Sequence, residues 1–541
     1  MTEALRAAAT VTKDAWWRGA VIYQIYPRSY VDSNGDGIGD LPGITSRLDH
    51  VASLGVDAVW ISPFFTSPMK DFGYDVADYC DVDPIFGTLA DFDALVERAH
   101  SLGLKVIIDQ VYSHTSDAHA WFADSRSSRT NACADWYVWA DPKDDGSPPS
   151  NWQSVFGGPA WTWDARRRQY YMHNFLSSQP QLNVHNPDVQ QALLDTARFW
   201  LDRGVNGFRL DALNFAMFDP TFTDNPPAPP SNNVKTRSFD YQERIHNQSH
   251  ADIPYFIERI RTLTDSYQGV FTVAEVGGTS AIAEAEKKAF IAGSSRLNSA
   301  YGFEFLYADA LTPALVRETL ENWPESDGWP SWAFSNHDAP RAASRWASVE
   351  DRPAFTRMAL LLLLLLRGNI FLYQGEELGL TQVDIAFDQL QDPEAIANWP
   401  LTLSRDGART PMPWLADTPN AGFTTGEPWL PVGEDNQISA VDVQDRDDQS
   451  VLALTRRLIA FRHASDALRS GRMIFVAATN DILAFERVAE SQRLLCLFNF
   501  SAEVRRWEPA QRDRWRVVEG VNGADTWALP PFGAIVAEQI A

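Results

Sequence analysis

Acidic, histidine and arginine side chains recur in this sequence at the ends of short apolar runs, where parallel α/β proteins place their reactive groups. The residues concerned are Asp109, His114, Arg209, Asp211, Glu275, His337 and Asp338. Arg209 and Asp211 alternate along one run, so both side chains are expected on the same face of a strand. Cleavage of a glycosidic bond needs two carboxyl groups, and hydrogen bonds to sugar hydroxyls that strengthen in the transition state. These residue types, gathered at one barrel mouth, satisfy that requirement.

The elements that must position these residues are short apolar strands separated by helical segments. Seven strands are predicted, at residues 21–27, 56–62, 104–111, 207–213, 271–276, 332–337 and 369–375. A weaker eighth strand is predicted around Gly302 to Phe305. Strand–helix alternation with continuous apolar strands is typical of parallel α/β architecture. The sequence therefore predicts a (β/α)8 TIM barrel.

Two regions depart from the strand–helix pattern. Residues 114–179 hold six tryptophans with little helical periodicity, and they predict a small domain inserted after the third strand. Short alternating runs after a helix near 447–464 predict a C-terminal all-β domain, a β-sandwich, over residues 467–541. The catalytic barrel is then expected over residues 1–113 and 180–466. Insertions at the carboxyl ends of barrel strands build the mouth of the active site.

Charge, hydropathy and cysteine usage argue against several classes of partner. The formal net charge of −25 disfavours nucleic acid and anionic membranes and suits a neutral substrate. The longest apolar run, Met358 to Leu366, is nine residues long, far below the ~20 that span a bilayer. Three scattered cysteines and an N-terminus without an apolar leader favour a reducing, cytoplasmic location.

Four blocks at the predicted strand ends resemble the signature blocks of the α-amylase family of glycoside hydrolases. They are DQVYSH (109–114), GFRLDALN (207–214), VAEVGG (273–278) and FSNHD (334–338), in that order. The flanking segments DFGYDVADY (71–79), QPQLN (179–183) and RTPMPW (409–414) narrow the resemblance to α-glucosidases and oligo-1,6-glucosidases. The similarity extends over nearly the whole chain.

The resemblance implies a role for each matching residue. Asp211 matches the nucleophile, Arg209 the partner that keeps it ionised, and Glu275 the general acid/base, which must carry a proton near neutral pH. Asp338 matches the third carboxylate, which grips sugar hydroxyls. The remaining substrate-binding matches are His114, His337, Asp71, Tyr74 and Arg409. An Asp71–Arg409 pair is expected to close the terminal-glucose subsite and favour exo cleavage.

The sequence departs from the family pattern at two positions near the inserted domain. Ser113 stands where the family usually has Asn, and Gln181 where it usually has Asp. In α-amylases this region supplies ligands to a calcium ion. Ser and Gln are poorer calcium ligands than a carboxylate, so we do not expect that calcium site here.

A different metal site is expected in the segment DSNGDGIGD (32–40). Asp32, Asn34, Asp36 and Asp40 supply oxygen ligands at alternating or nearby positions with glycines between them. The twelfth residue counted from Asp32 is Gly43 and not Glu, so the segment is not an EF-hand. Spacing alone also fits a solvated acidic turn. The resemblance implies a structural Ca²⁺ or Mg²⁺, with the carbonyl of Ile38 as a further ligand, and no organic cofactor.

The sequence thus predicts a retaining, exo-acting α-glucosidase that hydrolyses maltose, sucrose-like and aryl α-glucosides through a covalent glucosyl–Asp211 intermediate. Transglucosylation is an expected side activity. Alternatives are a dedicated transglucosidase or sucrose isomerase and, more remotely, a non-catalytic scaffold. Relatives that cleave isomaltose tend to carry Val where this chain has Ala212, which favours α-1,4 linkages here. Whether the protein is a monomer or a homodimer stays open.

Overall fold

The centre of the molecule is a closed barrel of eight parallel strands. The computed structural model describes residues 15–230, 235–278, 281–323, 328–401 and 404–540. The barrel strands are β1 (Val21–Ile25), β2 (Ala58–Ile61), β5 (Lys105–Val111), β9 (Gly207–Asp211), β10 (Phe271–Glu275), β11 (Ser299–Tyr301), β12 (Trp329–Trp332) and β13 (Asn369–Tyr373). They close in the order β1-β13-β12-β11-β10-β9-β5-β2. The predicted (β/α)8 barrel is confirmed.

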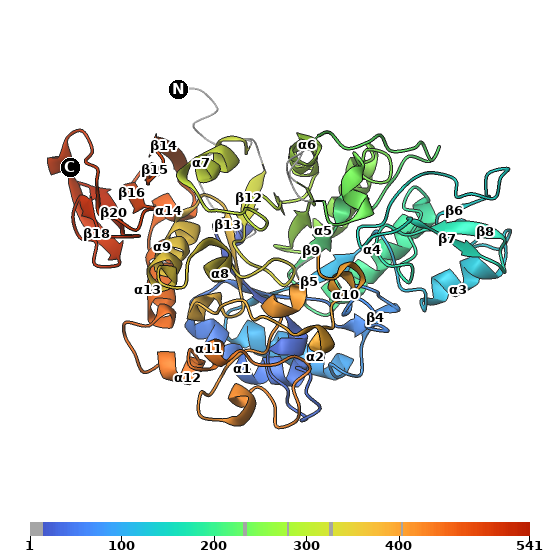
Figure 1. Ribbon diagram of the computed structural model, residues 1–541, viewed down its shortest axis with the longest axis horizontal. Coiled ribbons are helices and arrows are strands. Elements are labelled where there is room, and N and C mark those ends of the chain that lie inside the picture. Colours follow the sequence, from blue (N-terminus) through green and yellow to red (C-terminus); the bar gives the residue numbers. More distant parts are fainter. Residues whose placement is uncertain (1–14, 231–234, 279–280, 324–327, 402–403, 541) are drawn as a thin grey trace.

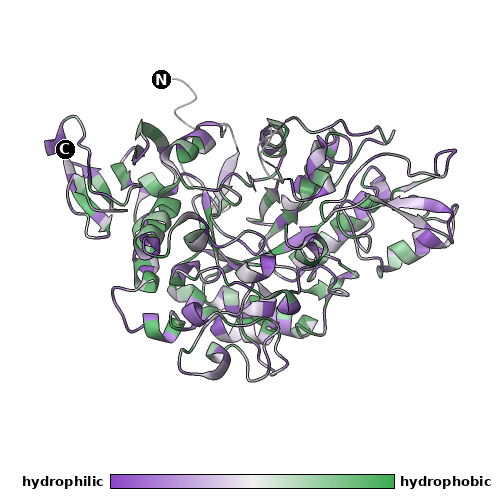
Figure 2. Cartoon of the chain, viewed as in Figure 1, coloured by the Kyte–Doolittle hydropathy of each residue, from purple (hydrophilic) through white to green (hydrophobic). Residues whose placement is uncertain are grey.

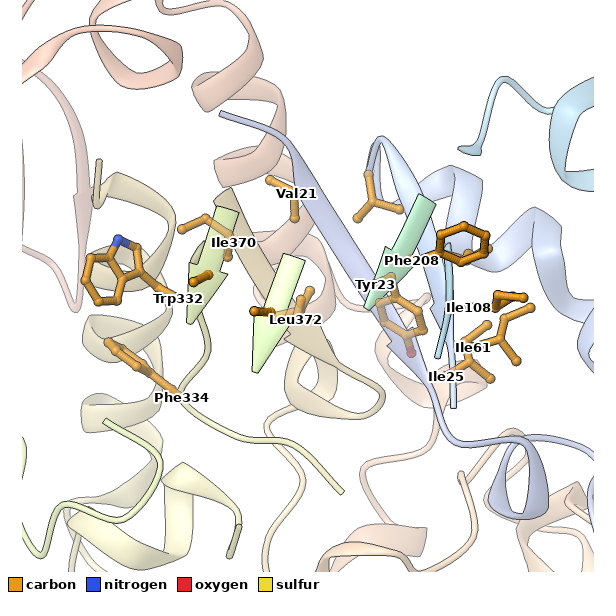
Figure 3. Close-up of a cluster of buried hydrophobic side chains, with 14 of the residues drawn as sticks. Val21, Tyr23, Ile25, Ile61, Ile108, Phe208, Trp332, Phe334, Ile370 and Leu372 are labelled. Carbon is orange, nitrogen blue, oxygen red and sulfur yellow. The ribbon is translucent and has the colours of Figure 1, made fainter. Parts of the chain in front are cut away.

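Alternation along each strand divides the side chains between the barrel interior and the surrounding helices. On β9, Phe208 and Leu210 belong to the large outer core, whereas Arg209 points into the barrel. Figure 3 shows side chains of the outer core, among them Val21, Tyr23 and Ile370. Register pairs Asp109 with Arg209 and Glu275 with Tyr301, so these four side chains lie in neighbouring positions of one inner layer.

Helices surround the barrel and cover its outer face (Figure 1). The longer ones are α1 (Leu41–Ser53), α2 (Leu89–Ser101), α4 (Pro187–Asp202), α5 (Ile253–Thr264), α6 (Ala281–Phe290), α7 (Pro313–Glu321), α9 (Arg352–Leu365) and α13 (Val451–His463). Figure 2 shows hydrophobic and hydrophilic residues mixed along these helices, as expected for helices with one buried face. The apolar run Met358–Leu366 is buried throughout, as part of α9 and the residue after it.

Two smaller units lie at opposite ends of the molecule (Figure 1). Between β5 and α4 the chain forms α3 (Ala120–Ser127) and a three-stranded antiparallel sheet of β6 (Trp139–Ala140), β7 (Trp161–Asp164) and β8 (Gln169–Met172). At the C-terminus, β14 (Arg472–Ala478), β15 (Ile482–Val488), β16 (Arg493–Asn499), β18 (Trp515–Val521) and β20 (Ala534–Gln539) form a five-stranded antiparallel sheet. Strands β17 (Arg505–Arg506) and β19 (Ala528–Leu529) form a second, two-stranded sheet. The C-terminal region is therefore all-β.

A buried arginine joins the C-terminal sheet to the barrel. Arg487 of β15 donates to the carbonyl of Leu365 at the end of α9, at 2.6 Å, and to the carbonyls of Leu468 and Gly471 at 2.8 and 3.1 Å. Burial lowers the pKa of Arg487 to about 9. Its hydrogen bonds satisfy carbonyl groups that a helix end leaves without partners.

Two predicted strands lie elsewhere in the structure. The strand expected at Gly302 to Phe305 is β11, which ends at Tyr301, and the strand expected at 332–337 is β12, which ends at Trp332. Residues 333–337 are buried because they turn into the barrel mouth, and burial alone gave them the apolar pattern of a strand. Residues 1–14, for which no apolar leader is predicted, lie outside the described residues. No helix in the described part of the chain has the length and apolar character needed to cross a membrane.

Candidate active site

Three carboxyl groups surround the guanidinium of Arg209 at the carboxyl end of the barrel. Nη1 of Arg209 lies 3.0 Å from Oδ1 of Asp109 and 2.5 Å from Oδ1 of Asp211, and Nη2 lies 2.6 Å from Oε1 of Glu275. Tyr301 donates to Oε1 of Glu275 at 3.2 Å, and the backbone N–H of Ala212 donates to its Oε2 at 3.1 Å. Asp211 and Glu275 are therefore held close together by one cation.

Burial makes this cluster costly to ionise completely. It raises the pKa of Asp109 to about 6, although Arg209 opposes the shift. Burial also raises the pKa of Asp211, with Glu275 and Asp109 adding to the rise and Arg209 again opposing it. Three carboxyl groups share one guanidinium, so the cluster favours holding a proton near neutral pH. A pair of carboxyl groups in general acid catalysis needs one such proton.

Tyr74 and His337 form a second layer beside Asp109. The Tyr74 hydroxyl lies 2.6 Å from Nε2 of His337 and donates to Asp109 at 3.1 Å, and the two rings stack at 5.4 Å. Gln24 Nε2 lies 2.8 Å from Nδ1 of His337, which makes Nδ1 the acceptor and Nε2 the protonated nitrogen. Burial lowers the pKa of His337 to about 3, so the ring is neutral and positions Tyr74 as a hydrogen-bonding group.

The two arginines of the segment 405–409 differ in their partners from the expectation. Arg409 contacts Asp338, with Nη2 2.6 Å from Oδ1, and donates to the carbonyl of His337 at 2.7 Å. The cation that pairs with Asp71 is Arg405, at 3.0 Å. Arg405 also lies 2.8 Å from Asp392 and 3.4 Å from Asp338. The expected Asp71–Arg409 ion pair is therefore wrong, and Arg405 takes that place.

Asp71 and Asp338 differ in the direction of their pKa shifts because their surroundings differ. Burial raises the pKa of Asp71 to about 6, against the effect of Arg405. For Asp338 burial opposes ionisation, but His337, Arg409 and Arg405 outweigh it and lower the pKa. The segment that carries Asp71 bends sharply at Phe72 (φ 52°) and Gly73 (φ 105°), which turns Asp71 and Tyr74 to the same side.

His114 lies on the inserted-domain side of Asp71. Its Nε2 is 3.1 Å from the carbonyl of Tyr74 and 3.2 Å from Nε2 of Gln179, and Gln179 donates to Asp71 at 3.0 Å. Burial lowers the pKa of His114 to about 4, so the ring is neutral. Ser113 contacts Nδ1 of His114 at 2.9 Å, and Gln181 donates to the carbonyl of Phe215 at 2.7 Å. Ser113 and Gln181 are thus engaged by the protein itself.

The site presents more acid than base to whatever it binds. Arg209, Arg405 and Arg409 are its three arginines. Against them stand six carboxyl groups, which are Asp71, Asp109, Asp211, Glu275, Asp338 and Asp392. Such a surplus accepts hydrogen bonds from hydroxyl groups and stabilises a positively charged, oxocarbenium-like transition state.

The segment Asp32–Asp40 folds into a series of tight turns, in which side-chain oxygens accept from backbone N–H groups. Asp32 accepts from the N–H groups of Asn34, Gly35 and Gly37, Asn34 from Asp36, and Asp36 from Ile38, at 2.7 to 2.9 Å. Asp40 accepts from Ser33 at 2.9 Å and caps α1. Within the described residues, the carboxylates of Asp32, Asp36 and Asp40 do not form a set of oxygens within 4.8 Å of one another. The loop contains oxygen atoms that could bind a cation, but several of them already accept hydrogen bonds from backbone N–H groups.

Five residues of the site were not predicted, namely Gln24, Gln179, Tyr301, Asp392 and Arg405. Gln179 opens the QPQLN segment and Arg405 stands four residues before Arg409, so both lie inside segments already singled out. Asp392 lies in an irregular stretch that carries no periodic signal. Tyr301 lies at the end of β11, the strand that was predicted a few residues too far along the chain.

A barrel with this acid cluster at its mouth defines a glycoside hydrolase of the α-amylase type. The family model of the α-amylase catalytic domain matches residues 24–471. The chain therefore belongs to the α-amylase family of glycoside hydrolases and is an enzyme of that family.

Individual relatives show which members of the family this chain is similar to. The chain is 52% identical over 496 residues to a protein of Rhizobium meliloti (strain 1021) named "Probable alpha-glucosidase", covering 90% of each chain. It is 36% identical to an oligo-1,6-glucosidase of Heyndrickxia coagulans, covering 94% of this chain and 96% of that one. Among solved structures, an α-glucosyl transfer enzyme, XgtA, superposes with a TM-score of 0.92 at 49% identity, covering 97% of this chain and all (100%) of that one.

Proposed function

We propose that this protein is a retaining, exo-acting α-glucosidase that cleaves terminal glucose from short α-glucosides. The observation that carries the proposal is the placement of Asp211 and Glu275 on one guanidinium at the barrel mouth. The family supports the reaction class, and relatives named as α-glucosidases and oligo-1,6-glucosidases support the substrate class.

The first step forms a covalent intermediate. A carboxylate oxygen of Asp211 attacks the anomeric carbon while the bond from that carbon to the glycosidic oxygen breaks. Glu275 donates its proton to the leaving oxygen, and Arg209 stabilises the carboxylate of Asp211 as it approaches. Asp338, paired with Arg409, accepts hydrogen bonds from the ring hydroxyls as positive charge develops on the sugar.

The second step releases the glucosyl group. Glu275, now ionised, takes a proton from a water molecule, and the water oxygen bonds to the anomeric carbon as the bond to Asp211 breaks. Two inversions give net retention. Proton NMR of the first product from an α-glucoside should therefore show α-glucose before mutarotation. Initial β-glucose would exclude this mechanism.

The ion pair of Asp71 and Arg405 supports exo cleavage of short substrates. Asp71 is buried and Arg405 is mostly covered, with 12% of its side chain exposed, and Gln179 and Asp392 connect the pair to the surrounding loops. A subsite closed on that side admits one terminal glucose and excludes the interior of a polymer. Maltose, sucrose and aryl α-glucosides should be hydrolysed faster than starch, as a product time-course would measure.

Transfer of glucose to a hydroxyl compound is a second candidate activity, because the same glucosyl–Asp211 intermediate serves both reactions. It is favoured by the similarity to the α-glucosyl transfer enzyme. A solved isomaltulose synthase variant from Erwinia rhapontici, bound to sucrose, is a more distant relative with 32% identity and a TM-score of 0.88. The outcome depends on whether water or another hydroxyl reaches the intermediate first.

We also propose that the loop Asp32–Asp40 binds a structural Ca²⁺ or Mg²⁺. The donors are oxygens of Asp32, Asn34, Asp36 and Asp40 with the Ile38 carbonyl, which are ligands that these cations prefer. Binding requires these oxygens to come closer together, because the carboxylates of Asp32, Asp36 and Asp40 do not form a set within 4.8 Å of one another among the described residues. The cation stabilises the fold and takes no part in the reaction.

The remaining proposals concern the cellular location, the partners and the oligomeric state of the protein. All three cysteines are free thiols, which fits the reducing cytoplasm. The net charge of −25 supports a neutral sugar as the partner and disfavours nucleic acid and anionic membranes. Oligomeric state is left open between monomer and homodimer.

A further inference from the structure

Two histidines and a carboxylate form a compact group outside the acids described so far. His185 stands two residues before α4, and His250 and Asp252 lie in the three residues before α5. The two helices are neighbours (Figure 1). One ligand atom from each of the three side chains lies within 4.8 Å of the other two. Residues far apart in the sequence therefore meet where two adjacent helices begin.

The ring of His185 is oriented by the segment that follows β9. Its Nε2 lies 2.8 Å from the carbonyl oxygen of Phe218, and a carbonyl oxygen can only accept, so Nε2 carries the proton. The other ring nitrogen, Nδ1, then keeps its lone pair. Histidines that bind metals almost always donate their second ring N–H to a carbonyl group or a carboxylate, which fixes the tautomer and the direction of the ring. His185 is held in this way for binding through Nδ1.

His250 and Asp252 supply the other two ligand atoms. Nδ1 of His250 accepts from the N–H of Asp252 at 3.2 Å and lies 3.7 Å from its Oδ2. An accepting Nδ1 is unprotonated, as metal binding requires. A cation at Nδ1 replaces this long hydrogen bond, and water can then satisfy the N–H at the helix start. Although Asp252 holds the N-cap position of α5, its carboxylate makes no capping hydrogen bond to the described first turn.

The charges near the group leave room for a cation. Among the described residues, His250 and Asp252 are the charged groups that act on the ring of His185. Arg259, two turns further along α5, is engaged by Gln190 at 2.8 Å. The N-termini of α4 and α5 carry partial positive charge, which opposes a cation, but the effect is confined to the first turn and the carboxylate of Asp252 offsets it.

The mixture of nitrogen and oxygen ligands selects the kind of metal. Imidazole suits Zn²⁺ and other first-row transition-metal ions, whereas Ca²⁺ and Mg²⁺ prefer oxygen ligands alone. Ligand atoms stand about 2.0–2.2 Å from Zn²⁺, so two of them are at most about 4.4 Å apart. The 3.7 Å between His250 and Asp252 meets this limit, and the set of three needs only a small closure. Their side chains are 26% and 52% exposed, which leaves a position for water as fourth ligand.

We propose that His185, His250 and Asp252 bind one Zn²⁺ or a similar transition-metal ion, with water completing the coordination. The site shares no residue with the oxygen-rich loop Asp32–Asp40, nor with Ser113 and Gln181 at the position of the α-amylase calcium. The ion joins the start of α4 to the start of α5 and, through His185, to the segment after β9. It stabilises this part of the barrel and takes no part in the reaction at Asp211.

The test uses the full-length protein without a polyhistidine tag, treated with EDTA and dialysed into buffer with excess Mg²⁺, which fills sites that prefer oxygen ligands. Calorimetric titration should show one Zn²⁺ bound per chain, and Zn²⁺ should raise Tm. His185→Gln keeps a side-chain N–H for the Phe218 carbonyl but removes Nδ1, and His250→Asn keeps an acceptor for the N–H of Asp252. Each variant should bind Zn²⁺ about 100-fold more weakly, because loss of even an outer partner of a metal ligand costs 10–100-fold.

His246→Gln is the matched control, because His246 lies in the same loop as His250 but pairs with Asp219, at 3.5 Å, outside the group of three. Its affinity for Zn²⁺ should equal that of the wild type. No Zn²⁺ binding by the wild type in Mg²⁺, or wild-type affinity in both His185→Gln and His250→Asn, would overturn the proposal. An equal loss of affinity in His246→Gln would also overturn it. If His185→Gln does not fold, His250→Asn decides the question.

Discussion

The cluster around Arg209 and the cluster around Arg405 meet at one barrel mouth but are built differently. Asp109, Arg209, Asp211 and Glu275 lie on adjacent parallel strands, so hydrogen-bond register fixes their spacing. The partners of Arg405 come from three separate loops, carrying Asp71, Asp338 and Asp392. Strands give precise placement for bond making, whereas loops can vary from relative to relative and adjust what is bound.

The largest effect is expected at the strand-held acids. Asp211→Asn and Glu275→Gln are nearly isosteric, and each deletes one carboxyl role of a two-step reaction. Each should lower kcat by about 10³-fold or more. Release of p-nitrophenol from its α-glucoside measures the loss, and circular dichroism with thermal unfolding checks the fold. A variant that keeps more than a few per cent of the wild-type rate, with contamination excluded, would remove that residue from its role.

A smaller effect is expected at the loop-held arginine. Arg405→Ala leaves Asp71 and Asp392 buried without their shared cation and should lower kcat/KM for maltose by about 10²-fold. Loss of a nearby positive charge raises the pKa of a carboxyl group, here Asp71 from about 6. Because only ionised Asp71 accepts hydrogen bonds through both oxygens, the acid limb of the pH profile of kcat/KM should move to higher pH.

Arg405→Lys separates charge from geometry at the same position. Lys keeps the positive charge, so the acid limb should stay in place, but one ammonium group cannot span the three carboxylates. KM should therefore rise with little change in kcat. A shift of the acid limb in Arg405→Lys equal to that in Arg405→Ala would show that Asp71 does not set the limb.

Linkage preference should respond more weakly still. Ala212 follows the nucleophile with a φ of 40°, and it packs with Phe215 and Phe239. Val at that position adds methyl groups to the wall and strains a left-handed backbone. Ala212→Val should shift the ratio of kcat/KM for maltose and isomaltose by about tenfold toward isomaltose. An isomaltose preference already in the wild type would contradict the expected α-1,4 preference.

The loop Asp32–Asp40 should affect stability and leave activity unchanged. A cation that binds only the folded state raises the free energy of unfolding, by about 2.7 kcal/mol at one hundred times its Kd. Chelation with EDTA should lower Tm by a few degrees, and added Ca²⁺ or Mg²⁺ should restore it. No shift in Tm, together with no metal by elemental analysis, would return the loop to a solvated turn.

The same division between strands and loops explains what the sequence could predict. Continuous apolar strands made the barrel predictable, and alternation on β9 placed Arg209 and Asp211 on one face. Arg405 and Arg409 are four residues apart, in and directly after a short 3-10 helix (Arg405–Ala408), and nothing in the local sequence distinguishes their partners. The roles of the catalytic residues stay predictions until the variants are measured.

Arg487 also affects the order in which the hydrogen bonds of the barrel can form during protein synthesis. The carbonyl of Leu365, at the end of α9, receives its donor from a residue 122 positions later. On a ribosome, all eight barrel strands, which end at Tyr373, are made before that donor emerges. Until then, the Leu365 carbonyl in the last turn of α9 must accept its hydrogen bond from water. The barrel therefore gains this hydrogen bond only after β15 has been synthesised, and a protein truncated before β15 would lack it.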